Sequence, residues 1–221
     1  MENYNPSIAS TSAISINKVL RNTYLLLSMT LLFSAVMAVV SMMFKVSHVV
    51  SLVCSFGALG LIWLVLPKTA HSSAGIGVVF AITGLLGFGL GPILNAYLSL
   101  ANGPELIATS LGGTGVIFLA LSAYVLTTRK DFSFMGGFLM VGLIIAILAM
   151  VANLFFQIPA LSLALSGAII LIMSGFILFD TSRIIHGGET NYVNATVSLY
   201  LSIYNIFVSL LQILGIFGGD D

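Results

Sequence analysis

One acidic side chain stands near the end of a long apolar stretch of this sequence. The stretch "GFILFDTSRIIHGGET" (residues 175–190) places Asp180, Arg183 and His186 within seven positions, although only 6% of the chain is charged. An acid at membrane depth is by default a candidate for function, so we predict a proton-sensitive contact at Asp180. Arg183, three residues later on the same helix face, and Lys68 are its candidate ion-pair partners. The alternative is an ordinary helix end, which accounts fully for Arg183 and for His186, a residue followed by two glycines.

A polar stripe runs along the last apolar stretch of the chain. It comprises Ser198, Ser202, Asn205, Ser209 and Gln212, at steps of four, three, four and three residues. At 100° per residue these side chains fall within an arc of roughly 80° on one helix face. A stripe facing lipid would be costly, so we predict that this helix is central or lines a cavity. The alternative is that the groups join helices through hydrogen bonds, worth on average about 0.6 kcal/mol each.

The composition requires a membrane for the elements that carry these residues. Hydrophobic residues make up 59% of the 221 residues. Only 6% of the residues are charged, whereas soluble domains carry roughly 25% charged residues. A spanning helix needs about 20 apolar residues. We predict an all-α membrane protein that consists of a flexible cytoplasmic N-terminal tail (1–21), a seven-helix transmembrane domain (22–217) and a short periplasmic tail (218–221). The predicted spans lie near residues 22–44, 46–66, 74–98, 106–128, 132–156, 160–182 and 196–217.

The distribution of lysine and arginine predicts the orientation of the bundle. With seven spans, one side of the membrane receives six basic residues and the other side receives Lys45 alone. Because cytoplasmic connections carry the excess of basic residues, we predict a cytoplasmic N-terminus and a periplasmic C-terminus. The six residues are Lys18, Arg21, Lys68, Arg129, Lys130 and Arg183.

Motifs for enzymatic chemistry are missing from the sequence. It contains no His-Glu-x-x-His zinc motif and no Gly-x-Ser-x-Gly nucleophile arrangement, and the last span has no lysine for a retinal Schiff base. Formal charge is zero and no basic run suggests nucleic acid as a partner. We therefore expect no catalytic residues, cofactor or metal site. Gly84, Gly87 and Gly91 are read as a helix-packing face rather than a phosphate loop, and Pro92 as a bend.

Several stretches resemble the Bax inhibitor-1 (transmembrane BAX inhibitor motif) family. They are "TGLLGFGLGPILNAYL", "SAYVLTTRKDFSFMGGFL", "FILFDTSRIIHGGETNYVNATVSLYLSIYNIF" and "LGIFGGDD". "NKVLRNTY" and "IIHGGETNY" are most similar to the bacterial branch of modulators of FtsH, a membrane-bound ATP-dependent protease. The resemblance implies a seven-helix bundle in the inner membrane with the last helix surrounded by the other six. It also implies a non-enzymatic protein that binds and restrains FtsH, together with that protease's membrane-bound regulatory proteins, and whose other partner is membrane lipid.

The resemblance also implies an alternative function, a pH-sensitive calcium leak. Other bacterial relatives are associated with such a leak through two aspartates near the cytoplasmic ends of the sixth and seventh helices. Asp180 matches the first, whereas the second falls on Ser202 in "LYLSIYNIF". A serine supplies no second negative charge, so the paired-acid sensor is incomplete in this chain. Asp180, with Ser198, Ser202, Asn205 and Ser209, remains the candidate sensor and polar core.

Overall fold

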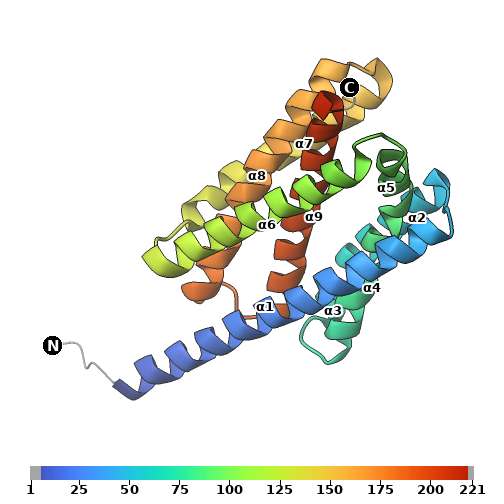
Figure 1. Cartoon of the computed structure of the whole chain (residues 1–221). Helices are drawn as coiled ribbons and strands as arrows, with labels where there is room; N and C mark the ends of the chain where they lie inside the picture. Colours follow the sequence, from blue (N-terminus) through green and yellow to red (C-terminus); the bar gives the residue numbers. More distant parts are fainter. Residues whose placement is uncertain (1–5, 219–221) are drawn as a thin grey trace.

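The structure is a computed structural model that describes residues 6–218, with side chains from residue 16 onward, and every described element is helical. Figure 1 shows the arrangement of these helices. Two short segments differ from α-helix: η1 is π-helical and η2 is a 3-10 turn. In chain order the elements are α1 (Pro6–Met43), α2 (His48–Gly60), η1 (Leu61–Val65), α3 (Leu66–Thr69), α4 (Ala74–Gly89), α5 (Gly91–Leu98), α6 (Gly103–Thr128), η2 (Ser133–Met135), α7 (Gly136–Phe156), α8 (Pro159–Ile185) and α9 (Tyr192–Gly218).

Seven helical segments are long and apolar enough to cross a membrane, which confirms the predicted all-α membrane protein. Most of their bounds lie within four residues of the predicted ones. Two connections end helices with residues in the left-handed region, Arg129 (φ 51°) and Gln157 (φ 50°). Pro159 stands in the first turn of α8, where a missing N–H costs no helical hydrogen bond. The segments are Ile16–Met43, His48–Thr69, Ala74–Leu98, Gly103–Thr128, Ser133–Phe156, Pro159–Ile185 and Tyr192–Gly218.

The N-terminal segment is more helical than its composition predicts. α1 begins at Pro6, so residues 6–21, which we placed in a tail ahead of the first span, belong to a helix. Within the residues whose side chains are described, its membrane-capable segment is Ile16–Met43. Residues 1–5 of the predicted tail, and residues 219–221 of the predicted C-terminal tail, lie outside the described residues. The flexibility of the tail stays a prediction.

Large apolar side chains cover the outside of the bundle. Trp63, Phe138 and Leu171 are each at least 75% exposed, and all three lie in membrane-capable segments. In water such a surface would aggregate, whereas lipid tails solvate it at no cost. The outer surface therefore faces the hydrocarbon of the bilayer.

Glycines bring α4 and α5 close to α1, as the sequence predicts. A Cβ atom on Gly87 would collide with the backbone carbonyl of Ser34, and one on Gly91 would collide with the Ser41 hydroxyl. Small residues permit this close approach because lipid provides no hydrophobic force that pushes helices together. The third span is interrupted at Leu90, two residues before Pro92 in the first turn of α5, which agrees with the predicted bend.

Helix α9 packs against α8, α6, α1 and α4. It carries many buried side chains, among them Leu199, Tyr200, Ile206 and Leu211, each at most 1% exposed. The Tyr200 hydroxyl lies 2.6 Å from Ser34 Oγ on α1, so a polar contact joins these two helices inside an apolar core.

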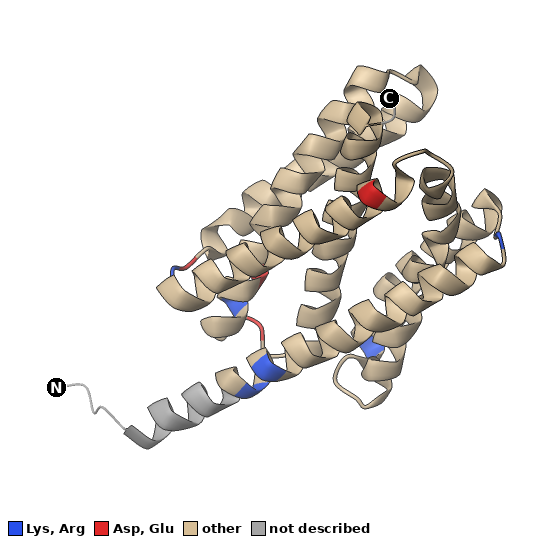
Figure 2. Cartoon of the chain, in the orientation of Figure 1, with Lys and Arg blue, Asp and Glu red and all other residues tan. Residues whose placement is uncertain are grey.

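Basic residues gather at one end of the bundle (Figure 2). We call this the basic end: it comprises Lys18, Arg21, Lys68, Arg129, Lys130 and Arg183. Lys45, in the connection from α1 to α2, lies at the opposite end.

Candidate functional site

Asp180 lies on α8, about one and a half turns before the helix ends, and is buried (7% exposed). Its Oδ2 atom accepts a hydrogen bond of 2.5 Å from the Ser198 hydroxyl on α9. The contact joins α8 to α9 near the basic end, where the connection at residues 186–191 links the end of α8 to the start of α9. Asp180 and Ser198 are thus brought together, as the candidate site requires.

The structure gives Arg183 a different partner from the one that we predicted. Its Nη2 atom lies 3.7 Å from Oε2 of Glu189 and donates to the Gly188 carbonyl at 3.0 Å. The guanidinium also stacks over the Phe179 ring, 5.4 Å from its centroid. Among the described side chains, therefore, Arg183 pairs with the connection after α8 and not with Asp180. The turn that follows the helix folds back and places Glu189 within its reach.

Lys68, the other candidate partner of Asp180, is exposed near the end of α3. Within residues 16–218 it forms no ion pair. A long exposed lysine is solvated at the membrane surface, which removes any need for a buried partner.

Three other residues of the polar stripe form hydrogen bonds within α9 or with α8. Ser202 is buried (2% exposed), and its hydroxyl donates to the Ser198 carbonyl at 3.2 Å. Its hydrogen bond therefore lies within α9, and it does not bind Asp180. At the far end of the stripe, Gln212 Oε1 accepts a bond of 2.8 Å from Ser166 on α8.

Asn205, Ser209 and Gln212 line a cavity of about 690 Å³ between α7, α8 and α9. Polar side chains from the other two helices, including Asn153, Ser162 and Ser166, line it as well. Asn153 donates to Ser162 at 2.6 Å. Three of the five stripe residues therefore line a cavity, whereas Ser198 and Gln212 join α9 to α8 through hydrogen bonds.

A second polar cluster, at the basic end, was not predicted. The Ser182 hydroxyl accepts the Phe132 amide at 2.9 Å and lies 3.3 Å from Oδ1 of Asp131. The imidazole of His186 lies between two backbone carbonyls, with Nδ1 2.9 Å from Ser182 O and Nε2 3.1 Å from Arg129 O. The end of α8 is thus tied to the connection between α6 and α7. His186, which we read as a simple loop residue, is one of these ties.

Hydrogen bonds stabilise the ionised form of Asp131 in this connection. The Ser133 side chain and its backbone amide, which donates at 2.8 Å, lower the pKa of the Asp131 carboxyl below its ordinary value of 3.8. Asp131 therefore stays charged at neutral pH while it orders the turn that leads into η2.

Asn191 ties the start of α9 to the connection after α3. Its Oδ1 atom accepts the Val193 amide at 2.9 Å, which caps the helix. Its Nδ2 atom donates to the Ala70 carbonyl at 2.9 Å. Asparagine before a helix is a recognisable cap signal in the sequence, but its second contact, 121 residues away, has no such signal.

The chemistry of the central site follows from its donor set. One carboxylate and one hydroxyl can take up or release a proton, whereas Ca²⁺ prefers six to eight oxygen ligands with several charges. In the described part of the chain, no three His, Cys, Asp or Glu side chains gather as a metal site would require. Asp180 and Ser198 together are suited to a proton-linked contact between two helices.

Comparisons with known proteins agree with this architecture. The sequence model of the family described as "Inhibitor of apoptosis-promoting Bax1" matches residues 16–219. The chain is 57% identical to "Modulator of FtsH protease YccA" of Escherichia coli (strain K12), over 95% of both chains. It has the same identity and coverage with "Inner membrane protein YccA" of Escherichia coli O6:H1. It is also 53% identical to a membrane protein of Vibrio cholerae, over 93% of this chain and 92% of the other.

Proposed function

Because the chain belongs to the Bax1-I family, the inhibitors of apoptosis-promoting Bax1, we propose that it is a non-enzymatic inner-membrane protein that binds and restrains FtsH. The observation that carries this proposal is the 57% identity, over 95% of both chains, with a protein named as a modulator of that protease. Identity at this level extends over the whole bundle rather than one motif. Location in the inner membrane is supported by the name of a second relative and by the seven membrane-capable helices.

The proposed topology has a cytoplasmic N-terminus, a periplasmic C-terminus and α9 as the central helix. The gathering of basic residues at the basic end supports the orientation. The packing of α9 against α8, α6, α1 and α4 supports its central position. Reporter fusions at either end of the chain, one active only in the cytoplasm and one only in the periplasm, test the orientation.

The N-terminal segment ahead of the first span is the proposed handle for FtsH. FtsH, by the family resemblance, takes membrane substrates by an exposed cytosolic end. Residues 6–15 belong to α1 and precede its membrane-capable segment, Ile16–Met43, at the basic end. A bundle held together by buried contacts would resist extraction after such a segment is engaged.

Co-purification from native membranes tests the proposal. The full chain, tagged at its C-terminus and expressed in a bacterium that contains FtsH, should recover FtsH, with the regulatory proteins of that protease, after mild solubilisation. Its overexpression should lengthen the half-life of a membrane substrate of FtsH. A variant that lacks residues 2–12 keeps all seven membrane-capable segments and should recover less FtsH.

The control is an unrelated seven-span membrane protein expressed at the same level, because overexpression alone loads the membrane. If the full chain recovers no FtsH and the substrate half-life equals that of the control, the proposed function is wrong. If FtsH is recovered but the substrate half-life is unchanged, the chain binds the protease without restraining it.

A pH-sensitive calcium leak is the alternative function. The burial of Asp180 at a helix contact, near a polar stripe that lines a cavity, favours it. Ser202 at the second acidic position of the family pattern weighs against it, because a hydroxyl carries no charge to attract a divalent cation.

A further inference from the structure

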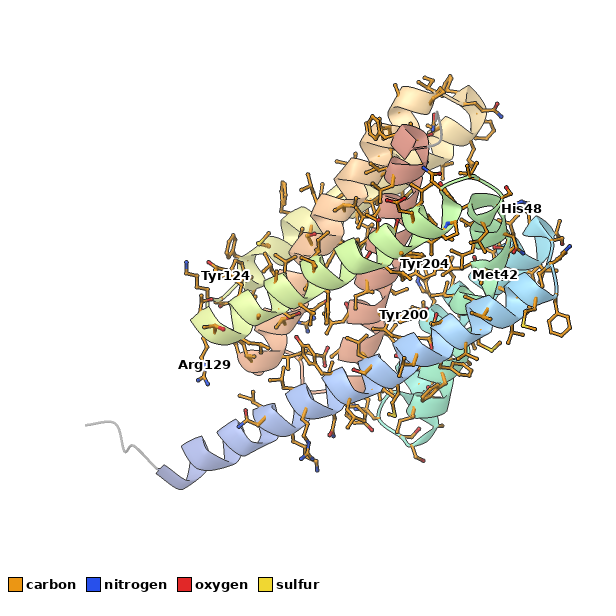
Figure 3. The ribbon with its side chains drawn as sticks, in the orientation of Figure 1. Met42, His48, Tyr124, Arg129, Tyr200 and Tyr204 are labelled. Atoms are coloured by element: carbon orange, nitrogen blue, oxygen red, sulfur yellow. The ribbon has the colours of Figure 1, made fainter. Side chains whose placement is uncertain are left out.

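An apolar groove of about 470 Å³ opens between α1 and α6, with α9 as its floor. Figure 3 shows Tyr200 and Tyr204 of α9 lying between the ribbons of these two helices, and Met42 on α1. α1 packs against α4, α9, α5 and α8, and α6 against α9, α8 and α5. These two helices are not among the described pairs that pack extensively together. A lateral opening is therefore built into the bundle.

The groove opens to lipid and not to water. Both of its walls belong to membrane-capable segments. Val39 on the α1 wall and Leu111 on the α6 wall line the groove and are 49% and 56% exposed, so the rim is open at membrane depth. In a bilayer, an apolar space with an open rim is filled by the molecules that surround it.

Three of the four polar side chains that line the groove, Ser34, Thr114 and Tyr200, form hydrogen bonds within the protein, whereas the Tyr204 hydroxyl forms none with the described residues. The Tyr200 hydroxyl lies 2.6 Å from Ser34 Oγ and donates to the Thr83 carbonyl at 3.3 Å. The Thr114 hydroxyl donates to the Ser110 carbonyl at 2.7 Å. The surface offered to an occupant is thus mostly hydrocarbon, and an apolar occupant loses no hydrogen bonds on entering.

The volume of the groove matches an enclosed lipid tail better than an enclosed protein helix. A spanning helix is a cylinder about 10 Å wide and about 30 Å long, which corresponds to roughly 2,400 Å³. That is several times the 470 Å³ of the groove. A methylene group occupies about the 30 Å³ of one liquid water, so the groove holds a chain of roughly 16 carbons, the size of one phospholipid tail.

We propose that the groove between α1 and α6 binds one acyl chain of a membrane phospholipid. One end of the groove is lined by Met42, next to the last residue of α1, and by Ile107, in the first turns of α6. Both helix ends lie opposite the basic end. The bound lipid therefore belongs to the leaflet on that side. This site is independent of any contact with FtsH.

Two glycines on α6 provide a matched pair of variants for the test. A Cβ atom on Gly115 or on Gly112 would meet nothing within 4 Å, so both positions accept a larger side chain. Gly115 lines the groove and Gly112 does not. Gly115→Phe should fill the groove, and Gly112→Phe should leave it open. Ala35→Phe, which enters from the α1 wall, provides a second blocking variant.

The full chain is reconstituted in vesicles of phosphatidylethanolamine and phosphatidylglycerol that contain a trace of phosphatidylethanolamine with a diazirine in its acyl chain. After illumination, mass spectrometry maps the adducts. Adducts should concentrate on the groove residues of α1, α6 and α9. Gly115→Phe and Ala35→Phe should reduce them several-fold, and Gly112→Phe should not.

Adducts spread evenly over the lipid-facing surface, or unchanged in both blocking variants, would overturn the proposal. So would a protein occupant, which a benzoylphenylalanine at position 111, on the exposed rim of the groove, would capture in cells as a protein adduct. The melting temperature of each variant, measured in the same vesicles, verifies that the bundle is folded.

Discussion

The Ser198 hydroxyl donates a hydrogen bond of 2.5 Å to Oδ2 of Asp180 and so joins α9 to α8 near the basic end. Ser202, one turn further along α9, bonds only to the backbone of its own helix. Two serines of the same stripe therefore differ in what their loss leaves unpaired, and this difference leads to the first prediction.

Ser198→Ala should lower the free energy of unfolding by about 1–2 kcal/mol, because it leaves a buried carboxyl group without its donor. Ser202→Ala should cost clearly less, since the carbonyl that loses its bond keeps its helical partner. Thermal unfolding in detergent, followed by loss of helical signal, measures both. Equal losses would show that the contact with Asp180 does not stabilise the bundle.

Gly87→Ala should destabilise the bundle by about 1–3 kcal/mol, because the added methyl group would collide with the backbone of Ser34 and force α4 away from α1. Gly77→Ala, on the same helix, is the control: its Cβ would meet nothing within 4 Å. That variant should be neutral or slightly stabilising. Thermal unfolding in detergent compares the two variants. If Gly87→Ala is as stable as the natural chain, α1 and α4 can separate without a loss of stability.

Ser182→Ala should loosen the connection between α6 and α7, because the Phe132 amide loses its acceptor. A cost of about 1 kcal/mol is expected. Thr181→Val is a matched control at the next position, since the Thr181 hydroxyl is buried without a hydrogen-bond partner among the described residues. Its removal should be neutral or stabilising. Limited proteolysis of the connection compares the two variants, and equal cleavage rates would contradict the assigned role of Ser182.

The stability of the turn at Asp131 should depend on pH. Since the folded-state pKa of Asp131 is lowered, its stabilising contribution is complete above 3.8, the ordinary value, and is lost as the pH falls through the lower folded-state pKa. Hydrogen exchange of the Ser133 amide should accelerate relative to that of a neighbouring helix when the pH falls through this range. In Asp131→Asn this acid-dependent change should disappear. A change of the same size in both proteins would assign it to another group.

Ser202→Asp tests the alternative function directly. A carboxylate at position 202, one helical turn from the Ser198 that binds Asp180, supplies a second charge for a divalent cation, and two nearby acids can share a proton. Calcium flux into proteoliposomes should be absent with the natural chain and should appear, with pH dependence, in Ser202→Asp. Adding Asp180→Asn to that variant should abolish it. Pronounced flux with the natural chain would favour the leak over the modulator as its function.

The sequence predicted the spans well because lipid imposes a length and a polarity on every crossing segment. It also placed the polar stripe of α9 against protein, since lipid would not tolerate Asn205 or Gln212. The partners were harder to predict. Asp180 bonds to Ser198, and Arg183 pairs with Glu189 across a turn whose path no periodicity describes. His186 contacts the Arg129 carbonyl, 57 residues away. Contacts between connections follow from loop conformation, and composition does not encode that conformation.

Trp63, which faces outward from the π-helical segment η1, is the single tryptophan of the chain. Its indole is therefore a native fluorescence reporter of the bilayer that needs no labelling or mutation. Emission wavelength and quenching by brominated lipids can report the depth of the second span. Because η1 does not contribute to the groove between α1 and α6, the same signal also provides an internal reference for every lipid-binding measurement on this protein.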